Sequence, residues 1–334
     1  MKKFLLKIII ALANFFLVFF GFKLTKFPTA KIGALIEAYF QCLYLNKSKK
    51  MIFICTEEIS NNYVFKHVRK KIKIYSSNFL THLYFSKKGD KNYPDHKYYH
   101  SFPQKKYIDE LVLNKQNHVI EFSENDKKKI ISILDEIDFK KNFNGYEKFI
   151  SLNLRSAIYH KDKNNTIRNN YDLESFNKII NFFKEKRILF ITNLITEDIN
   201  LNKSKDIDLL NKNLVLNINN LMIDADKKEL LQLYFFNKSE FTMGCNAGSN
   251  FMPLLFNKKI LLHNIAFPDY FYNHGNLSPI LLPKKYLDIK NNKLIPYKNI
   301  LKPEIIKLKH NEELLNLGIK VIDNSDDELL LASK

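Results

Sequence analysis

Short apolar runs alternate with helix-like stretches along most of this 334-residue chain, and each run stops abruptly at polar residues. Continuous apolar runs are typical of parallel strands that are buried on both faces of a sheet. The strands predicted in this way are residues 51–55, 71–75, 149–154, 187–192, 214–218, 241–243 and 259–263. Strands that alternate with helices in this order predict an α/β fold.

Helices are predicted between these strands from apolar spacing and from capping residues. Ser123 and Asp126 form the pattern of a capping box in front of a helix at 127–137. The other predicted helices are residues 34–45, 172–184, 226–236 and 249–256. Because 334 residues exceed the size at which one core keeps growing, we expect two Rossmann-like domains, at 28–145 and 146–334.

The segment 242–256, TMGCNAGSNFMPLLF, is predicted to pass from a strand through a tight turn into a helix. Gly244 and Gly248 permit φ > 0 and leave no Cβ in the way of a ligand. Ser249 or Asn250 is the predicted N-cap, and the free N–H groups of such a turn favour phosphate. An ordinary βα turn is the alternative. The residues expected to cradle an anion are Gly244, Asn246, Gly248 and Ser249.

A second polar segment, NLRSAIYHKDKNNTIRN at 153–169, follows the predicted strand 149–154. Arg155 comes where a parallel strand reaches its carboxyl end, which is the edge where ligands of open α/β sheets bind. Arg168 lies shortly before a predicted helix. Guanidinium groups match phosphate oxygens in a planar fork. The two segments together predict a diphosphate site for a sugar nucleotide, although either arginine alone could be a surface residue with local partners.

These segments resemble a family of bacterial glycosyltransferases from capsule and O-antigen gene clusters, whose fold is related to the O-fucosyltransferase-like branch of the GT-B group. The matching residues are Arg155, Tyr159, Arg168, Asn169, Gly244 and Gly248. The resemblance extends to 31–33, 282–286 with 291–293, and 318–324, and so covers nearly the whole chain. It implies two Rossmann-like domains facing a cleft, with the acceptor on 28–145 and the nucleotide sugar on 146–334. Gly33 would approach the donor from the first domain.

The resemblance also implies a reaction, which is inverting transfer of a hexose or deoxyhexose without a metal or cofactor. Arg155 and Arg168 would hold the diphosphate, and Arg155 would stabilise its departure. His160 could serve as the base, with a structural histidine as the alternative. Ser156 stands where the family usually has an acid, and the strand 187–192 ends without the expected Arg-x-Gly. A non-catalytic nucleotide-sugar or glycan-binding partner in a surface-polysaccharide complex is therefore the alternative function.

The first 27 residues form a separate apolar segment. Residues 4–22 are apolar except for Lys7 and Asn14, and no acidic residue precedes Glu37. The uncharged run 8–22 is shorter than the roughly 20 residues of a spanning helix. We predict a helix in the interface of the cytoplasmic leaflet of the inner membrane, with a spanning helix as the alternative. A cleaved signal peptide is disfavoured because no small-residue cleavage site follows.

A net charge of +18 limits the expected partners. The lysines lie in short scattered runs and do not interleave with aromatic residues, so nucleic acid is not expected. An anionic membrane surface or an acidic glycan explains the charge better. The expected partners are a nucleotide-sugar donor, a glycan or lipid-linked acceptor, and the cytoplasmic membrane surface. Three cysteines without metal spacing fit a reducing compartment.

Overall fold

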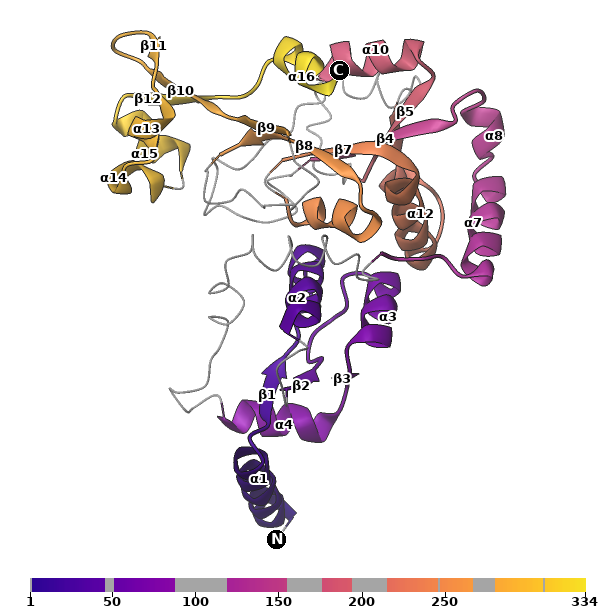
Figure 1. The fold of residues 1–334 in the computed structure, drawn as a ribbon, viewed down its shortest axis with the longest axis vertical. Coiled ribbons are helices and arrows are strands. Elements are labelled where there is room, and N and C mark those ends of the chain that lie inside the picture. Colours follow the sequence, from indigo (N-terminus) through magenta and orange to yellow (C-terminus); the bar gives the residue numbers. More distant parts are fainter. Residues whose placement is uncertain are drawn as a thin grey trace. The chain divides into compact units, whose positions relative to one another are not determined.

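The computed structural model describes residues 2–45, 51–87, 119–154, 176–193, 215–245, 247–266, 280–308 and 310–334. The chain divides into two compact units, Met1–Ile120 and Glu121–Lys334 (Figure 1). Both units contain parallel sheets, so the predicted α/β class is confirmed. The sequence-based division assigned residues 121–145 to the first domain. In the structure, α7 (Glu124–Glu136) packs against α12 (Ala225–Lys238) of the second unit.

The first unit is built on a three-stranded parallel sheet with the order β1-β2-β3. Its strands are β1 (Lys23–Lys26), β2 (Met51–Ile54) and β3 (Ile74–Tyr75). Its helices are α1 (Lys2–Phe19), α2 (Ile32–Leu45), α3 (Asn62–Lys71) and α4 (Asn78–Lys87). The predicted strand 51–55 and helix 34–45 are confirmed. The predicted strand 71–75 is too long at its start, because α3 continues through Lys71. Strand β1 was not predicted.

The second unit contains a six-stranded sheet in which every pair is parallel, with the order β6-β5-β4-β7-β8-β9. The strands are β4 (Lys148–Asn153), β5 (Ile188–Thr192), β6 (Val215–Asn217), β7 (Ser239–Gly244), β8 (Lys259–Ile265) and β9 (Ile280–Pro283). Strands β4 to β8 lie within two residues of their predicted bounds. Each is buried along most of its length, as expected for a parallel sheet covered on both faces.

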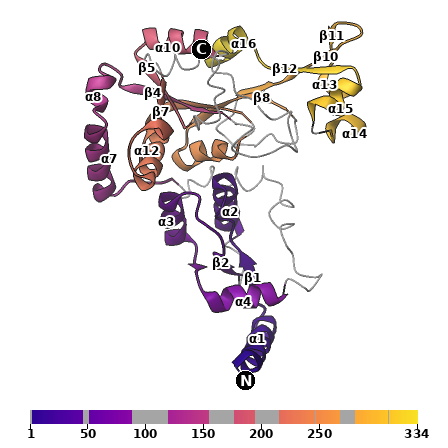
Figure 2. The same ribbon diagram turned by 180° about the vertical axis from the view of Figure 1, so that it is seen from behind.

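Helices cover both faces of this sheet (Figures 1 and 2). On one face, α10 (Asn177–Glu185) packs on β5, and α16 (Asp326–Ser333) packs on β8. On the other face, α12 packs on β4 and on the 3-10 helix η5 (Gly248–Phe256). The core between α10 and the sheet is made of apolar side chains from strands and helix, including Ile150, Leu152, Ile179, Ile180, Phe183, Phe190 and Met243. The doubly covered sheet leaves its strand ends as the place for a ligand.

A small antiparallel sheet follows β9, with the order β11-β10-β12. Its strands are β10 (Lys285–Asp288), β11 (Lys293–Leu294) and β12 (Ile319–Ile322). Three short helices join them, namely α13 (Tyr297–Ile300), α14 (Pro303–Ile306) and α15 (Asn311–Asn316). Tyr286 and Ile300 form the centre of a separate core there.

The N-terminal apolar segment forms α1, which contacts β1 and α4. Among the described residues, no helix combines the length and the apolar character needed to cross a membrane. Placement of α1 in a membrane interface stays a prediction.

The predicted capping box at the start of α7 is confirmed. The backbone N–H of Asp126 donates to Ser123 Oγ over 3.2 Å, and the N–H of Ser123 donates to Asp126 Oδ2 over 3.1 Å. The helix begins at Glu124, three residues before the predicted start at 127.

We expect Ser123→Ala to lower the free energy of unfolding by about 1 kcal/mol, because an N-cap that binds a helix N–H is lost. Asn125→Ala is the matched control in the same turn, and its effect should stay within about 0.5 kcal/mol. Urea denaturation of the two variants measures both values. Equal losses would show that the cap does not hold α7 in place.

Candidate active site

The two polar segments singled out in the sequence leave neighbouring strands of the six-stranded sheet. Strand β4 pairs directly with β7 in parallel, and Asn153 is the register partner of Gly244. The backbone N–H of Cys245 donates to the carbonyl oxygen of Asn153 over 3.3 Å, which extends the pairing beyond the strand end. The prediction that both segments start at the same carboxyl edge is therefore confirmed.

Several predicted site residues fall outside the described part of the chain. These are Arg155, Tyr159, His160, Arg168, Asn169 and Asn246. Their roles in binding or catalysis stay predictions. Gly33 is buried at the second position of α2, just after the loop that follows β1. It belongs to the first unit, whereas the other predicted residues belong to the second.

Gly244 is required by a neighbouring side chain. A Cβ atom at this position would overlap Asn250 Oδ1 and would lie 2.8 Å from Cγ of the same residue. The Asn250 side chain is fully buried, and its Nδ2 donates to the carbonyl oxygen of Cys245. The amide thus folds back onto the end of β7 and occupies the space that a Cβ would need. Packing alone is a sufficient reason for glycine here.

The helix after this turn differs from the prediction. It is a 3-10 helix that begins at Gly248, its N-cap is Ala247, and no side chain caps it. The prediction of Ser249 or Asn250 as N-cap is wrong, because both residues lie inside the first turn and Asn250 binds the carbonyl of Cys245 instead. Neither Gly244 nor Gly248 is among the described glycines with positive φ, which are Gly21, Gly145 and Gly318. The expectation that these two positions use φ > 0 is therefore wrong.

Buried polar atoms gather where β4 and β7 end. Asn153 Nδ2, Thr242 Oγ1 and Asn250 Oδ1 have no hydrogen-bond partner among the described residues. All three side chains are buried. A buried polar atom without a partner costs on the order of 1–3 kcal/mol, so this end of the sheet requires polar partners. Sequence reasoning assigned Asn250 only a capping role and gave no role to Asn153 and Thr242, although a polar residue at the end of an apolar run, such as Asn153, was the available signal.

A small cavity lies beside Asn153, under the ends of β4 and β5. Its volume is about 10 Å³, and its polar lining comes from Ser151, Asn153, Thr192, Asn193 and Gln232. This is about the volume that a single water molecule needs. It is far too small for a nucleotide.

His263 lies in the next strand and is held neutral. Its side chain is fully buried, and its ring meets the Phe176 ring edge-on at 5.1 Å. Burial, and then the positive charge of Lys284, lower the pKa of His263 to about 3. A neutral imidazole is therefore fixed on β8, on the same face of the sheet as α10. The available sequence signal was a histidine within the apolar run 259–265.

The ends of β8 and β9 are tied to the segment before α16. Lys284 Nζ is buried and forms an ion pair with Asp323 at 2.7 Å. Asn264, with φ of 51°, and Asn324 exchange hydrogen bonds from backbone N–H to side-chain oxygen at 2.6 and 2.5 Å. These contacts fix the carboxyl edge on the β9 side. The charge at this edge is thus the ion pair of Lys284 with Asp323, while His263 is neutral.

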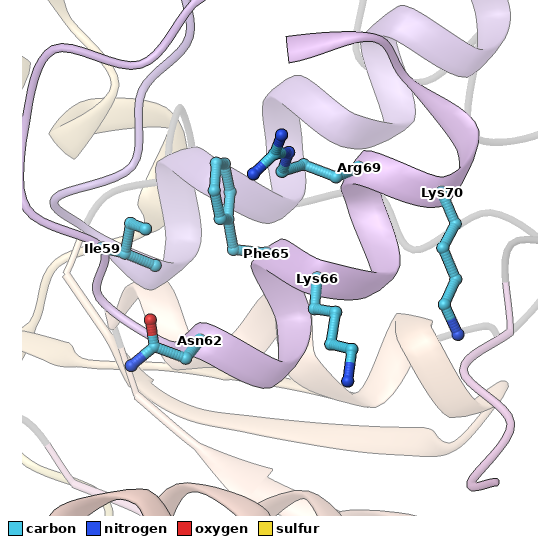
Figure 3. A pocket seen from close by; sticks show the side chains of 6 residues that line it. All are labelled: Ile59, Asn62, Phe65, Lys66, Arg69 and Lys70. Atoms are coloured by element: carbon cyan, nitrogen blue, oxygen red, sulfur yellow. The ribbon is translucent and has the colours of Figure 1, made fainter. Parts of the chain in front are cut away.

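A larger hollow of about 440 Å³ lies along α3 in the first unit. Its lining consists of Ile59, Asn62, Phe65, Lys66, Arg69 and Lys70 (Figure 3). In Figure 3, Arg69 extends beside the Phe65 ring, while Lys66 and Lys70 extend together in another direction. The Arg69 guanidinium lies 5.8 Å from the centre of that ring. Three cations and no carboxylate among the lining residues favour an anionic ligand.

Comparisons with known proteins give distant structural likeness only. No protein-family model matches the sequence. No curated protein matches it either. A glycosyl transferase of family 9 from Veillonella parvula is similar over 93% of this chain and 95% of its own, with a TM-score of 0.46 and 10% identity. A complex of S. aureus MnaA with UDP is similar over 72% of this chain and 78% of its own, with a TM-score of 0.32 and 11% identity. At TM-scores below 0.5, these likenesses carry no argument about activity.

We expect Gly244→Ala to lower the free energy of unfolding by about 1–3 kcal/mol, because the new methyl group overlaps Asn250. In an Asn250→Ala background the same change should cost at least about 1 kcal/mol less, since the overlapping amide is gone. Chemical denaturation of the four proteins of this cycle measures the difference. An equal cost in both backgrounds would mean that Asn250 is not the reason for the glycine.

We also expect His263 to weaken the fold in acid. Its pKa is about 3 in the folded protein, below the ordinary value of 6.5, so the unfolded chain binds the extra proton as the pH falls below 6.5. The contribution of the neutral His263 to the free energy of unfolding is therefore fully present above pH 6.5 and is lost as the pH falls toward 3. Between about pH 7 and pH 5, the free energy of unfolding of the parent should fall by about 2 kcal/mol more than that of His263→Leu.

The matched control for this experiment is His82→Leu, which changes an exposed histidine on α4. Its loss of stability between the two pH values should parallel that of the parent. Urea denaturation at each pH gives the comparison. If His263→Leu also parallels the parent, His263 is not buried in its neutral form.

Proposed function

We propose that the protein is a GT-B-type glycosyltransferase that moves a hexose or deoxyhexose from a nucleotide sugar to a cell-surface glycan or lipid-linked acceptor. The observation that carries this proposal is the direct parallel pairing of β4 with β7. We call 153–169 the arginine segment and 242–256 the glycine segment. Because of this pairing, the two segments leave the sheet from neighbouring positions, since Asn153 and Gly244 are register partners. Neighbouring strands lie about 4.8 Å apart, so two adjacent loops can reach a single diphosphate.

The donor is proposed to lie above this edge, on the second unit. Arg155 follows the end of β4 by two residues, and its planar fork suits phosphate oxygens. Arg168 would supply the second fork. The N–H groups at the start of η5, at Gly248 and Ser249, are of the kind that the first turn of a helix leaves without intrahelical partners, and they favour an anion. These groups together supply the positive charge that a departing nucleoside diphosphate needs.

The proposed chemistry is direct displacement at the sugar, which requires a base for the acceptor hydroxyl. His160 is the proposed base because it lies in the arginine segment and an imidazole titrates near neutral pH. The neutral His263 is unsuited to this role, since burial holds its pKa at about 3. In this scheme, Arg155 and Arg168 stabilise the charge that develops on the leaving diphosphate.

The acceptor is proposed to bind the first unit, at the α3 hollow. Lys66, Arg69 and Lys70 give the hollow a positive lining, and its volume of about 440 Å³ can hold a saccharide unit. An acidic sugar or a phosphate-linked glycan would satisfy these charges. The proposed acceptor is therefore an anionic one.

A non-catalytic sugar-nucleotide or glycan-binding protein is the second candidate. Ser156 follows Arg155 where the resembling family usually has an acid. The last described residues at the end of β5, Thr192 and Asn193, are uncharged. Thr192 Oγ1 donates to the carbonyl of Leu152, and the carbonyl of Asn193 accepts from Asn219. Slow hydrolysis of a bound nucleotide sugar, measured by release of nucleoside diphosphate, would identify an enzyme. Binding without any turnover across a donor panel would favour the second candidate.

We expect Arg155→Ala to weaken binding of nucleoside diphosphates about 10- to 100-fold, because a charge-assisted contact of about 1.5–3 kcal/mol is lost. Arg155→Lys should restore little, since an ammonium cannot form the bidentate fork. Calorimetry with UDP, GDP and CDP measures the affinities, and thermal unfolding without nucleotide reports on the fold.

Arg187→Lys is the matched control, because Arg187 is exposed and lies before β5, at the opposite end of the strand from the proposed site. Its nucleotide affinity should equal that of the parent. If Arg155→Ala binds nucleotide like the parent, or loses affinity only because it unfolds, the diphosphate site is not at the end of β4.

A further inference from the structure

Helix α1 has one face that packs against its own unit. Ile10, Ala13 and Leu17 lie on this face and contact a cluster made by Leu24, Ile54, Leu83 and Tyr84. These contacts join α1 to β1, β2 and α4. Both ribbon views show α1 at the end of the first unit, beside α4 (Figures 1 and 2).

The opposite face of α1 is apolar and exposed. Its large side chains are Leu5, Ile8, Ile9, Leu12, Phe15, Phe16 and Phe19. At 3.6 residues per turn, these positions fall within an arc of about 120° that excludes the packed face. The exposed face continues through stacked rings, with Phe15 on Phe19 at 6.0 Å and Phe16 on Phe20 at 6.3 Å. We call these seven residues, together with Phe20 directly after the helix, the exposed face of α1. Contiguous apolar patches of this kind mark interaction sites.

The positive charge in the sequence near α1 favours an anionic partner. The first acidic residue of the chain is Glu37, and the residues before it include Lys2, Lys3, Lys7, Lys23, Lys26 and Lys31. One of these, Lys26, forms an ion pair with Glu57. A second copy of the chain would bring a second lysine-rich helix against the first, and the like charges would repel. An anionic lipid surface offers both an apolar phase for the aromatic rings and negative charge for the lysines.

We propose that the exposed face of α1 inserts into the surface of an anionic lipid bilayer while the opposite face stays packed on the first unit. The helix then lies in the plane of the interface, since Ile10, Ala13 and Leu17 hold it along its length to β1 and α4. The proposal does not depend on glycosyl transfer.

Vesicle flotation of the full-length protein tests this proposal. The vesicles are phosphatidylcholine alone, or phosphatidylcholine with phosphatidylglycerol. The test variant carries Leu12→Ser, Phe16→Ser and Phe19→Ser, at side chains that are 54, 55 and 70% exposed. The matched control carries Leu317→Ser, Leu331→Ser and Met222→Ser in the second unit, where the exposed fractions are 57, 75 and 98%.

We expect the parent and the control to float with the phosphatidylglycerol vesicles. The test variant should partition about a thousandfold more weakly, because each of the three inserted large apolar side chains contributes a factor of about ten. Removal of phosphatidylglycerol, or high salt, should weaken the parent without abolishing its binding, since the apolar term is not screened. Circular dichroism and thermal unfolding should show that both variants remain folded.

Equal flotation of the test variant and the parent would overturn the proposal. So would a parent that does not float but sediments in ultracentrifugation as a defined dimer, with the test variant as a monomer. That outcome would assign the exposed face of α1 to a second copy of the chain. Binding that disappears entirely at high salt would assign the contact to the lysines and would also overturn insertion.

Discussion

The parallel pairing of β4 with β7 is the contact on which the second unit depends. The chain between these strands forms α10, β5, β6 and α12 before β7 returns beside β4. One register, with Asn153 opposite Gly244, then decides which loops share the carboxyl edge. A shift by one residue would turn every side chain of β4 to the opposite face, and burial on both faces of the sheet excludes this. The core therefore fixes where the two polar segments begin.

At the same edge, packing explains one of the glycines that the sequence had assigned to a ligand. Gly244 is explained by the amide of Asn250, which folds onto the end of β7, so this glycine is no independent sign of a ligand. Gly248 is the first residue of η5. The anion-binding role of both glycines stays a prediction. The unpartnered buried atoms of Asn153 and Thr242 add a second indication, because natural cores rarely leave such atoms unsatisfied.

The sequence predicted the sheet of the second unit well because strands buried on both faces are uninterrupted apolar runs, as in β4 and β8. It failed where a side chain overrode a local preference. The cap expected at Ser249 or Asn250 was lost to a bond between Asn250 and Cys245, five residues away. Strand β1 was missed because its four residues, KLTK, contain only one apolar side chain and follow an apolar helix. Its formation depends on pairing with β2, which no local pattern reports.

Helix α1 shows that composition alone does not indicate which face of an apolar helix is packed. A helix that is apolar on nearly every side gives no amphipathic pattern, so its sequence could not distinguish packed side chains from exposed ones. The structure makes this distinction, because the unit uses the face of Ile10, Ala13 and Leu17 and leaves the face of Phe16 and Phe19 uncovered. When the uncovered face enters lipid, its apolar side chains leave water, and the contacts of the packed face stay in place. Crossing the bilayer would require α1 to leave β1 and α4, and the side chains of Leu24 and Leu83 would lose their cover. Interfacial insertion is thus the mode that keeps the first unit intact.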